Sequence, residues 1–127
     1  MKRYNFIATD FVAPINAVSV SPTNFVSQSI SLKNIWAAAL TTYIKGTHAS
    51  CSGVITFVFV AWDSLRGMWD TTTYFTTTMT MIGTTPLQKT VTFDPCPEAV
   101  KLLSIANPET VAGYTVTANA SLLCHFV

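Results

Sequence analysis

His48-Ala49-Ser50-Cys51 places an imidazole close to a hydroxyl and a thiol, the side chains from which nucleophilic catalysis is built. Such a site also needs a third group that orients the base and a pocket for the developing oxyanion. No acidic residue lies near this segment in the sequence. We therefore interpret His48 as a loop residue and expect a protein that is not an enzyme, with no catalytic residue and no cofactor.

The cysteines lack the spacing of a metal site. Three is an odd number, and none of the pairs has metal-type spacing. Cys124 and His125 are adjacent, so in a strand they point to opposite faces and cannot chelate one ion. The prediction is no metal site, and small, buried, free thiols at Cys51, Cys96 and Cys124.

Two tryptophans and two aspartates flank a predicted hairpin. Residues 54–62 are rich in β-branched and aromatic side chains, residues 63–67 favour a turn, and residues 69–71 restart the chain. A first strand that is apolar on both faces belongs in the middle of a sheet. Asp63 and Asp70 could approach one another, but a Ca²⁺ site usually draws more oxygens than two carboxylates. Trp62 and Trp69 could stack on a sugar, although such aromatic side chains more often belong to a core or a subunit contact.

Turn residues separate further segments of strand character. The predicted strands besides the hairpin are 17–20, 25–32, 72–82, 87–93, 100–106 and 114–122. Lys33 to Lys45 fits both helical spacing and strand alternation, and its β neighbours favour the strand. With about seven to nine strands at these spacings, we predict an all-β, single-domain protein with the antiparallel β-sandwich architecture, jelly-roll-like in type.

The composition limits the possible partners. Charged residues are 10% of the 127 residues, against roughly 25% in ordinary soluble proteins, and the net charge is +1. We expect no nucleic-acid partner, no membrane partner and no spanning segment. A surface with so little charge indicates either a β domain solvated by hydroxyls or a subunit covered by neighbours, and we favour the subunit. The N-terminus lacks signal-peptide character, which predicts synthesis in a cytoplasm.

Residues 1–14 are predicted to form an N-terminal arm or edge strand, and residues 15–127 the β-sandwich domain. Tyr4, Phe6 and Phe11 give the first segment an aromatic character, while Asp10 and Pro14 argue against one continuous element. An aromatic arm of this kind could reach over a neighbouring subunit.

Several segments between residues 52 and 122 carry a family resemblance. They are Ser52-Gly53-Val54-Ile55-Thr56-Phe57, Trp62-Asp63-Ser64-Leu65-Arg66-Gly67-Met68-Trp69-Asp70-Thr71, Thr90-Val91-Thr92-Phe93-Asp94-Pro95, Val100-Lys101-Leu102-Leu103 and Tyr114-Thr115-Val116-Thr117-Ala118-Asn119-Ala120-Ser121. This order resembles small virion proteins of tailed bacteriophages, in which a Ser-Gly-Thr-Val-type strand leads to an Asp-Gly-x-x-Trp-type turn and a Thr-rich strand. The chain departs from that pattern at Leu65-Arg66, which lengthens the turn.

The resemblance implies a capsid decoration (cement) protein located in the virion. Such a protein would assemble with itself as a homo-oligomer, a trimer in many relatives, and bind the major capsid protein. The subunit or lattice contacts expected on this basis are Tyr4, Phe6, Phe11, Trp62 and Trp69. Two alternatives are open: a phage tail, neck or baseplate subunit, and a carbohydrate- or receptor-binding module.

Overall fold

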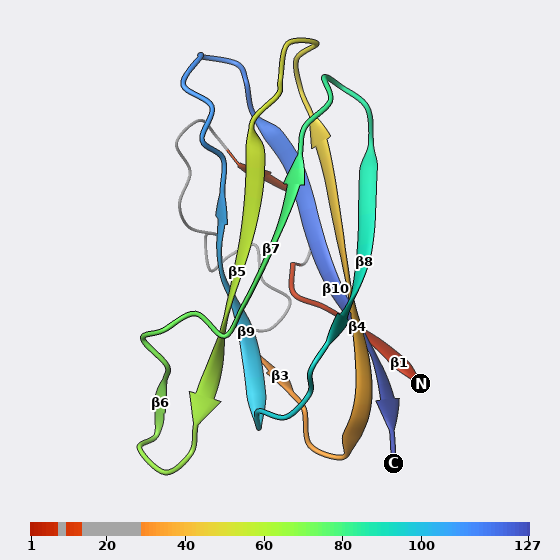
Figure 1. Ribbon diagram of the computed structural model, residues 1–127, viewed down its shortest axis with the longest axis vertical. Helices are drawn as coiled ribbons and strands as arrows, with labels where there is room; N and C mark the ends of the chain where they lie inside the picture. Colours follow the sequence, from red (N-terminus) through yellow and green to blue (C-terminus); the bar gives the residue numbers. More distant parts are fainter. Residues whose placement is uncertain (8–9, 14–28) are drawn as a thin grey trace.

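Two antiparallel sheets pack face to face in the computed structural model, which describes residues 1–7, 10–13 and 29–127 (Figure 1). The predicted all-β antiparallel sandwich is therefore confirmed. From β3 to β10 the chain crosses between the sheets at every connection except within the hairpin of β5, β6 and β7. The described part of the chain contains no helix able to span a membrane.

The first sheet has the strand order β1-β10-β4-β8, with β2 beside β1 along the same edge of β10. Its strands are β1 (Lys2–Asn5), β2 (Phe11–Ala13), β4 (Ile35–Gly46), β8 (Leu87–Phe93) and β10 (Val116–Phe126). β10 lies inside this sheet, because β1 and β2 pair with one of its edges and β4 pairs with the other. Every second side chain of β10 from Val116 to Cys124 is buried while the residues between them are half-buried, as expected for a strand with one covered face.

The second sheet has the order β3-β9-β5-β6, and β7 pairs with the earlier part of β5 along the same edge as β6. Its strands are β3 (Ile30–Ser31), β5 (Val54–Asp63), β6 (Met68–Trp69), β7 (Phe75–Thr80) and β9 (Ala99–Ala106). The predicted central position of residues 54–62 is confirmed. Only one face of β5 is fully covered, however: Ile55, Phe57 and Phe59 are buried, whereas Val54 on the other face is 45% exposed.

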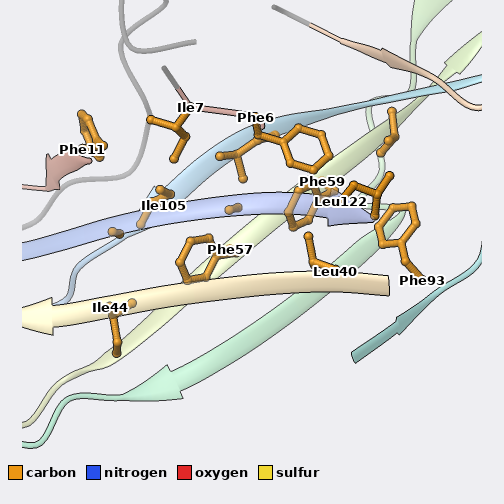
Figure 2. Close-up of a cluster of buried hydrophobic side chains, with 14 of the residues drawn as sticks. Phe6, Ile7, Phe11, Leu40, Ile44, Phe57, Phe59, Phe93, Ile105 and Leu122 are labelled. Atoms are coloured by element: carbon orange, nitrogen blue, oxygen red, sulfur yellow. The ribbon is translucent and has the colours of Figure 1, made fainter. Parts of the chain in front are cut away.

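The core lies between the sheets and is built around aromatic rings (Figure 2). The ring centroid of Phe59 lies 5.1 Å from that of Phe6 and 6.0 Å from that of Phe93, both edge to face. Leu40 and Leu122 from the first sheet pack into the same cluster. Each of these side chains comes from a different strand or segment, so the cluster joins the two sheets.

Within the range 33–45 the chain forms a strand, as favoured, and not a helix, although β4 starts only at Ile35 and Lys33 and Asn34 lie in the turn before it. Ala38, Leu40 and Ile44 are buried on one face of β4. Simple alternation along the strand would put Trp36 on that same face, but Trp36 is 65% exposed. Ile35 pairs with Phe126 and Ala37 with His125, so β4 carries one extra residue at Trp36, and this bulge turns the indole outward.

The N-terminal segment is part of the sandwich. β1 and β2 both pair with β10, and Phe6 and Phe11 are 1% and 8% exposed in the domain's own core. The predicted strand at 17–20 and most of the one at 25–32 lie outside the described residues, and β3 is the end of the latter.

Two of the three predicted buried thiols are buried. Cys51 and Cys124 lie in the core, but Cys96 is exposed, so that prediction was wrong. Pro95 and Pro97 on either side keep Cys96 out of the ladder, and its backbone N–H donates to Asp94 Oδ1 at 3.0 Å. The nearby carboxylate of Asp94 raises the pKa of the Cys96 thiol.

Candidate functional site

A row of four side chains runs across the outer face of the second sheet. Ser31 of β3 pairs with Ala99 of β9, and Trp62 of β5 pairs with Trp69 of β6. Since Ala61 pairs with Val100, Trp62 lies next to Ala99 and closes the row. Ala99 is the smallest side chain of the four, so the surface is hollowed between the serine and the indoles.

The turn between β5 and β6 fixes the two indoles. Asp63 Oδ1 accepts from the backbone N–H groups of Leu65 and Arg66 at 2.9 and 3.3 Å, while Oδ2 accepts from the Arg66 guanidinium at 3.0 Å. The Arg66 guanidinium thereby holds the pKa of the Asp63 carboxyl below its usual range. Asp63 is thus the turn-starting residue that the sequence indicates, and the insertion Leu65-Arg66 supplies its partners.

The indoles contact one another edge to face, with ring centroids 5.2 Å apart and an interplanar angle of 66°. Lys101 Nζ, from β9, lies 4.7 Å from the centroid of the Trp69 ring. Both tryptophans are half-buried. Trp69 therefore has an indole and a cation beside its ring, and both tryptophans border open space.

That open space is a groove of about 580 Å³ adjoined by a smaller hollow of about 320 Å³. Trp62 and Ala99 border both. The lining of the larger groove is Ser31, Leu32, Lys33, Trp62, Pro95, Cys96, Pro97, Glu98 and Ala99, and that of the smaller is Ser29, Trp62, Trp69 and Ala99. We call the two together the tryptophan groove. Its lining holds one cation and one anion, Lys33 and Glu98, beside hydroxyls and aromatic rings.

The outer face of the first sheet is of a different kind. On β4, β8 and β10 its outward side chains are Ala37, Ala39, Thr41, Tyr43 and Lys45 of β4, Gln88, Thr90 and Thr92 of β8, and Thr117, Asn119, Ser121, Leu123 and His125 of β10. We call this set the hydroxyl face. Lys45 is the single charged member of the set, and Arg3 of the neighbouring β1 pairs with Leu123 and lies beside it on the same side of the sheet. The hydroxyls of Thr41 and Thr90 bond to each other at 2.9 Å. The exposed Trp36 lies at one end, with its ring 5.7 Å from that of His125.

His48 lies in the turn after β4. Its ring stacks on Tyr114 with centroids 4.5 Å apart, and its Nδ1 accepts from the Ser50 backbone N–H at 3.0 Å. The neighbouring Cys51 is buried. Within the described ranges no three His, Cys, Asp or Glu side chains gather as metal ligands.

The five predicted contact residues separate into three groups. Phe6 and Phe11 belong to the core, which leaves them little surface to offer a neighbour. Tyr4 is half-buried against the core under Lys2, whose Nζ lies 4.8 Å from its ring centroid. Trp62 and Trp69 come together at the groove, and their role as contacts stays a prediction.

Sequence reasoning missed three residues of this region: Ser31, Ala99 and Lys101. They are distant from the hairpin along the chain, and only the register of β3, β9 and β5 brings them to it. None of the three carries a local signal that would have singled it out.

No protein-family model and no curated protein matches this sequence. The structure is similar to PRD1 vertex protein P5, with a TM-score of 0.51 and 8% identity over 98% of this chain and 94% of that one. It is also similar to the K1 cleaved adhesin domain of Lys-gingipain from Porphyromonas gingivalis W83, with a TM-score of 0.51 and 13% identity over 98% of this chain and 83% of that one.

Two further similar structures are longer than this chain. It spans 30% of an infectious bursal disease virus Gx strain chain at a TM-score of 0.48 and 11% identity, over 95% of its own length. It spans 59% of a CBM4 structure at a TM-score of 0.44 and 17% identity, over 77% of its own length. Because all of these sequence identities are low, the similarities show the fold alone. The comparisons and the strand pairing together establish an antiparallel β-sandwich.

Proposed function

We propose that this chain is a structural subunit of a virion: a capsid decoration protein that assembles with itself, as a trimer in the form that the resemblance implies, and binds the major capsid protein. The observation that carries the proposal is the hydroxyl face. It is a broad sheet surface in which Lys45 is the single charge among thirteen outward side chains of β4, β8 and β10.

Covering such a face costs little. Burying an unpaired charge is expensive, but small apolar groups and hydroxyls that are already hydrogen-bonded can be covered by a neighbour without that penalty. The hydroxyls of Thr41 and Thr90 are hydrogen-bonded to one another, and Ser121 Oγ accepts from the Arg3 guanidinium at 2.8 Å. Ala39 and Leu123 pair across β4 and β10 and add apolar surface.

A decoration protein also needs no reacting centre. Many copies on a lattice convert modest contacts into firm attachment, because each bound copy raises the effective concentration of the next contact within its oligomer. A rigid two-sheet scaffold with a face of low charge meets this requirement. PRD1 vertex protein P5 has a similar fold, so the architecture is compatible with a place in a particle.

The oligomer is tested by light scattering of the purified chain. We expect a mass of several protomers for the native protein and a monomer for Ala39→Lys, which places a charge in the middle of the hydroxyl face. Thr76→Lys puts the same charge on the outer face of the second sheet, at an exposed position of β7, and should leave the oligomer intact.

A monomeric native protein, or equal loss in both lysine variants at unchanged melting temperature, would overturn the hydroxyl face as the contact. The proposed binding to the capsid lattice is tested separately. Virions assembled in cells that produce this chain are labelled with an antibody against the chain and imaged. Label over the shell supports decoration, whereas label confined to a tail or neck would overturn the lattice assignment.

A further inference from the structure

We propose that the tryptophan groove is a binding site for a neutral oligosaccharide. The inference stands apart from the proposed function, because the groove lies on the sheet opposite the hydroxyl face. It rests on three features of the described residues: a floor of small side chains, an aromatic wall and a lining with balanced charge.

The floor is set by strand register. Ser31 and Ala99 are paired neighbours, and both have small side chains on the outer face. Trp62 rises on one side of them and the segment Pro95–Glu98 on another. Because the floor residues lie on paired strands, the hollow has a rigid base, which reduces the ordering cost of binding.

The aromatic wall favours a ring with an apolar face. Lys101 Nζ lies 4.7 Å from the centroid of the Trp69 ring, and the centroid of the Trp62 ring lies 5.2 Å from it. Trp62 itself borders both hollows. An indole offers a large, rigid apolar surface at low entropic cost, and the C–H face of a pyranose ring is a surface of matching shape.

The polar lining favours hydroxyls over charges. Within the larger groove Lys33 and Glu98 oppose one another in sign, so there neither an anionic nor a cationic ligand gains a net attraction, and Lys101 beside the smaller hollow is already engaged over the Trp69 ring. Ser31 hydroxyl, the Lys33 ammonium and the Glu98 carboxylate can donate to or accept from sugar hydroxyls. A volume of about 580 Å³ is within the range of small-molecule sites.

The test is a glycan array that displays neutral and anionic oligosaccharides, probed with the full chain, followed by fluorescence titration of the best neutral glycan. We expect neutral glycans to bind and Trp62→Ala to weaken binding about tenfold or more. Trp36→Ala is the matched control, because Trp36 is exposed on the first sheet and should leave the affinity unchanged.

A second variant guards against loss of fold. Ala99→Leu fills the floor of the groove while both indoles remain, so it should abolish glycan binding with little change in melting temperature. Absence of any neutral glycan ligand would overturn the proposal, as would binding that survives Ala99→Leu in a folded protein or that falls equally in Trp36→Ala.

Discussion

Asn107 satisfies three backbone groups at the end of β9, and it is 1% exposed. Its Nδ2 donates to the carbonyl oxygens of Ala13 and Tyr114 at 3.3 and 3.1 Å, and its Oδ1 accepts from the Glu109 backbone N–H at 3.1 Å. One amide thereby links the N-terminal strand β2 to the β9–β10 connection. No residue spacing in the sequence predicts this link.

Asn107→Ala should therefore lower the free energy of unfolding by about 1–3 kcal/mol, since it leaves buried carbonyl groups without donors. Urea unfolding measures the change. Asn119→Ala is the control: its Nδ2 donates to Asp10 Oδ1 at 2.6 Å on the exposed side of β10, and its loss should cost about 0.5 kcal/mol or less. Equal losses in the two variants would contradict this account of Asn107.

The hairpin turn should be acid-sensitive. The folded state lowers the pKa of Asp63 through the Arg66 guanidinium, so the turn's contribution is complete above the unfolded pKa and is lost as the pH falls through the folded pKa. We expect the amide NMR shifts of Leu65 and Arg66 to titrate with a midpoint below the pKa of an unperturbed aspartate. Asp63→Asn should abolish that titration, and a midpoint at or above the unperturbed value would refute the assignment.

At the scale of elements, period-two alternation predicts most strands because each has one covered face. β8 begins and ends at the predicted residues, and the alternating burial of β10 follows the predicted pattern. Bulges are different, since they arise from pairing between distant strands. Trp36 in β4 and Leu103 in β9 are both turned outward at such register shifts, and no local pattern marks either.

The candidate site, too, could be predicted from the sequence only in part. The sequence places Trp62 and Trp69 on a hairpin because the turn signal lies between them, and the structure pairs them. Ala99 and Ser31 come from other strands, and their contribution depends on a register that local residue types do not encode.

The connection between β7 and β8 approaches the end of β4 so closely that Gly46 has no room for a side chain. A methyl group there would meet the carbonyl oxygen of Gly83 and lie 2.9 Å from Cys51 Cβ. Gly46→Ala should cost about 1–3 kcal/mol in thermal or urea unfolding, because backbone cannot yield cheaply. At Gly53 the atoms nearest to an added methyl belong to the Glu109 side chain, which can shift more readily than backbone, so a larger loss for Gly53→Ala would contradict the argument.

For the whole molecule, the first residues are structural and not an appendage. Phe6→Ala should lower the free energy of unfolding by about 3–5 kcal/mol, because the ring fills the core between Phe59 and β10. Val12→Ala, at a residue that is 54% exposed on β2, should change it by about 0.5 kcal/mol or less. A Phe6→Ala protein as stable as the native one would show that the N-terminal strands are dispensable to the sandwich.

The central place of β10 has a consequence for how the chain reaches this structure. β1, β2 and β4 all pair with a strand that begins at Val116, 70 residues after its partner Gly46. During synthesis these three strands emerge long before β10 and must wait with open edges, and pairings over such separations form slowly, in milliseconds to seconds for sandwiches of this kind. During this interval the unpaired strand edges of neighbouring nascent chains could pair with one another. The low charge that suits a covered face does little to prevent such pairing, so this protein is most prone to aggregation before β10 has been made.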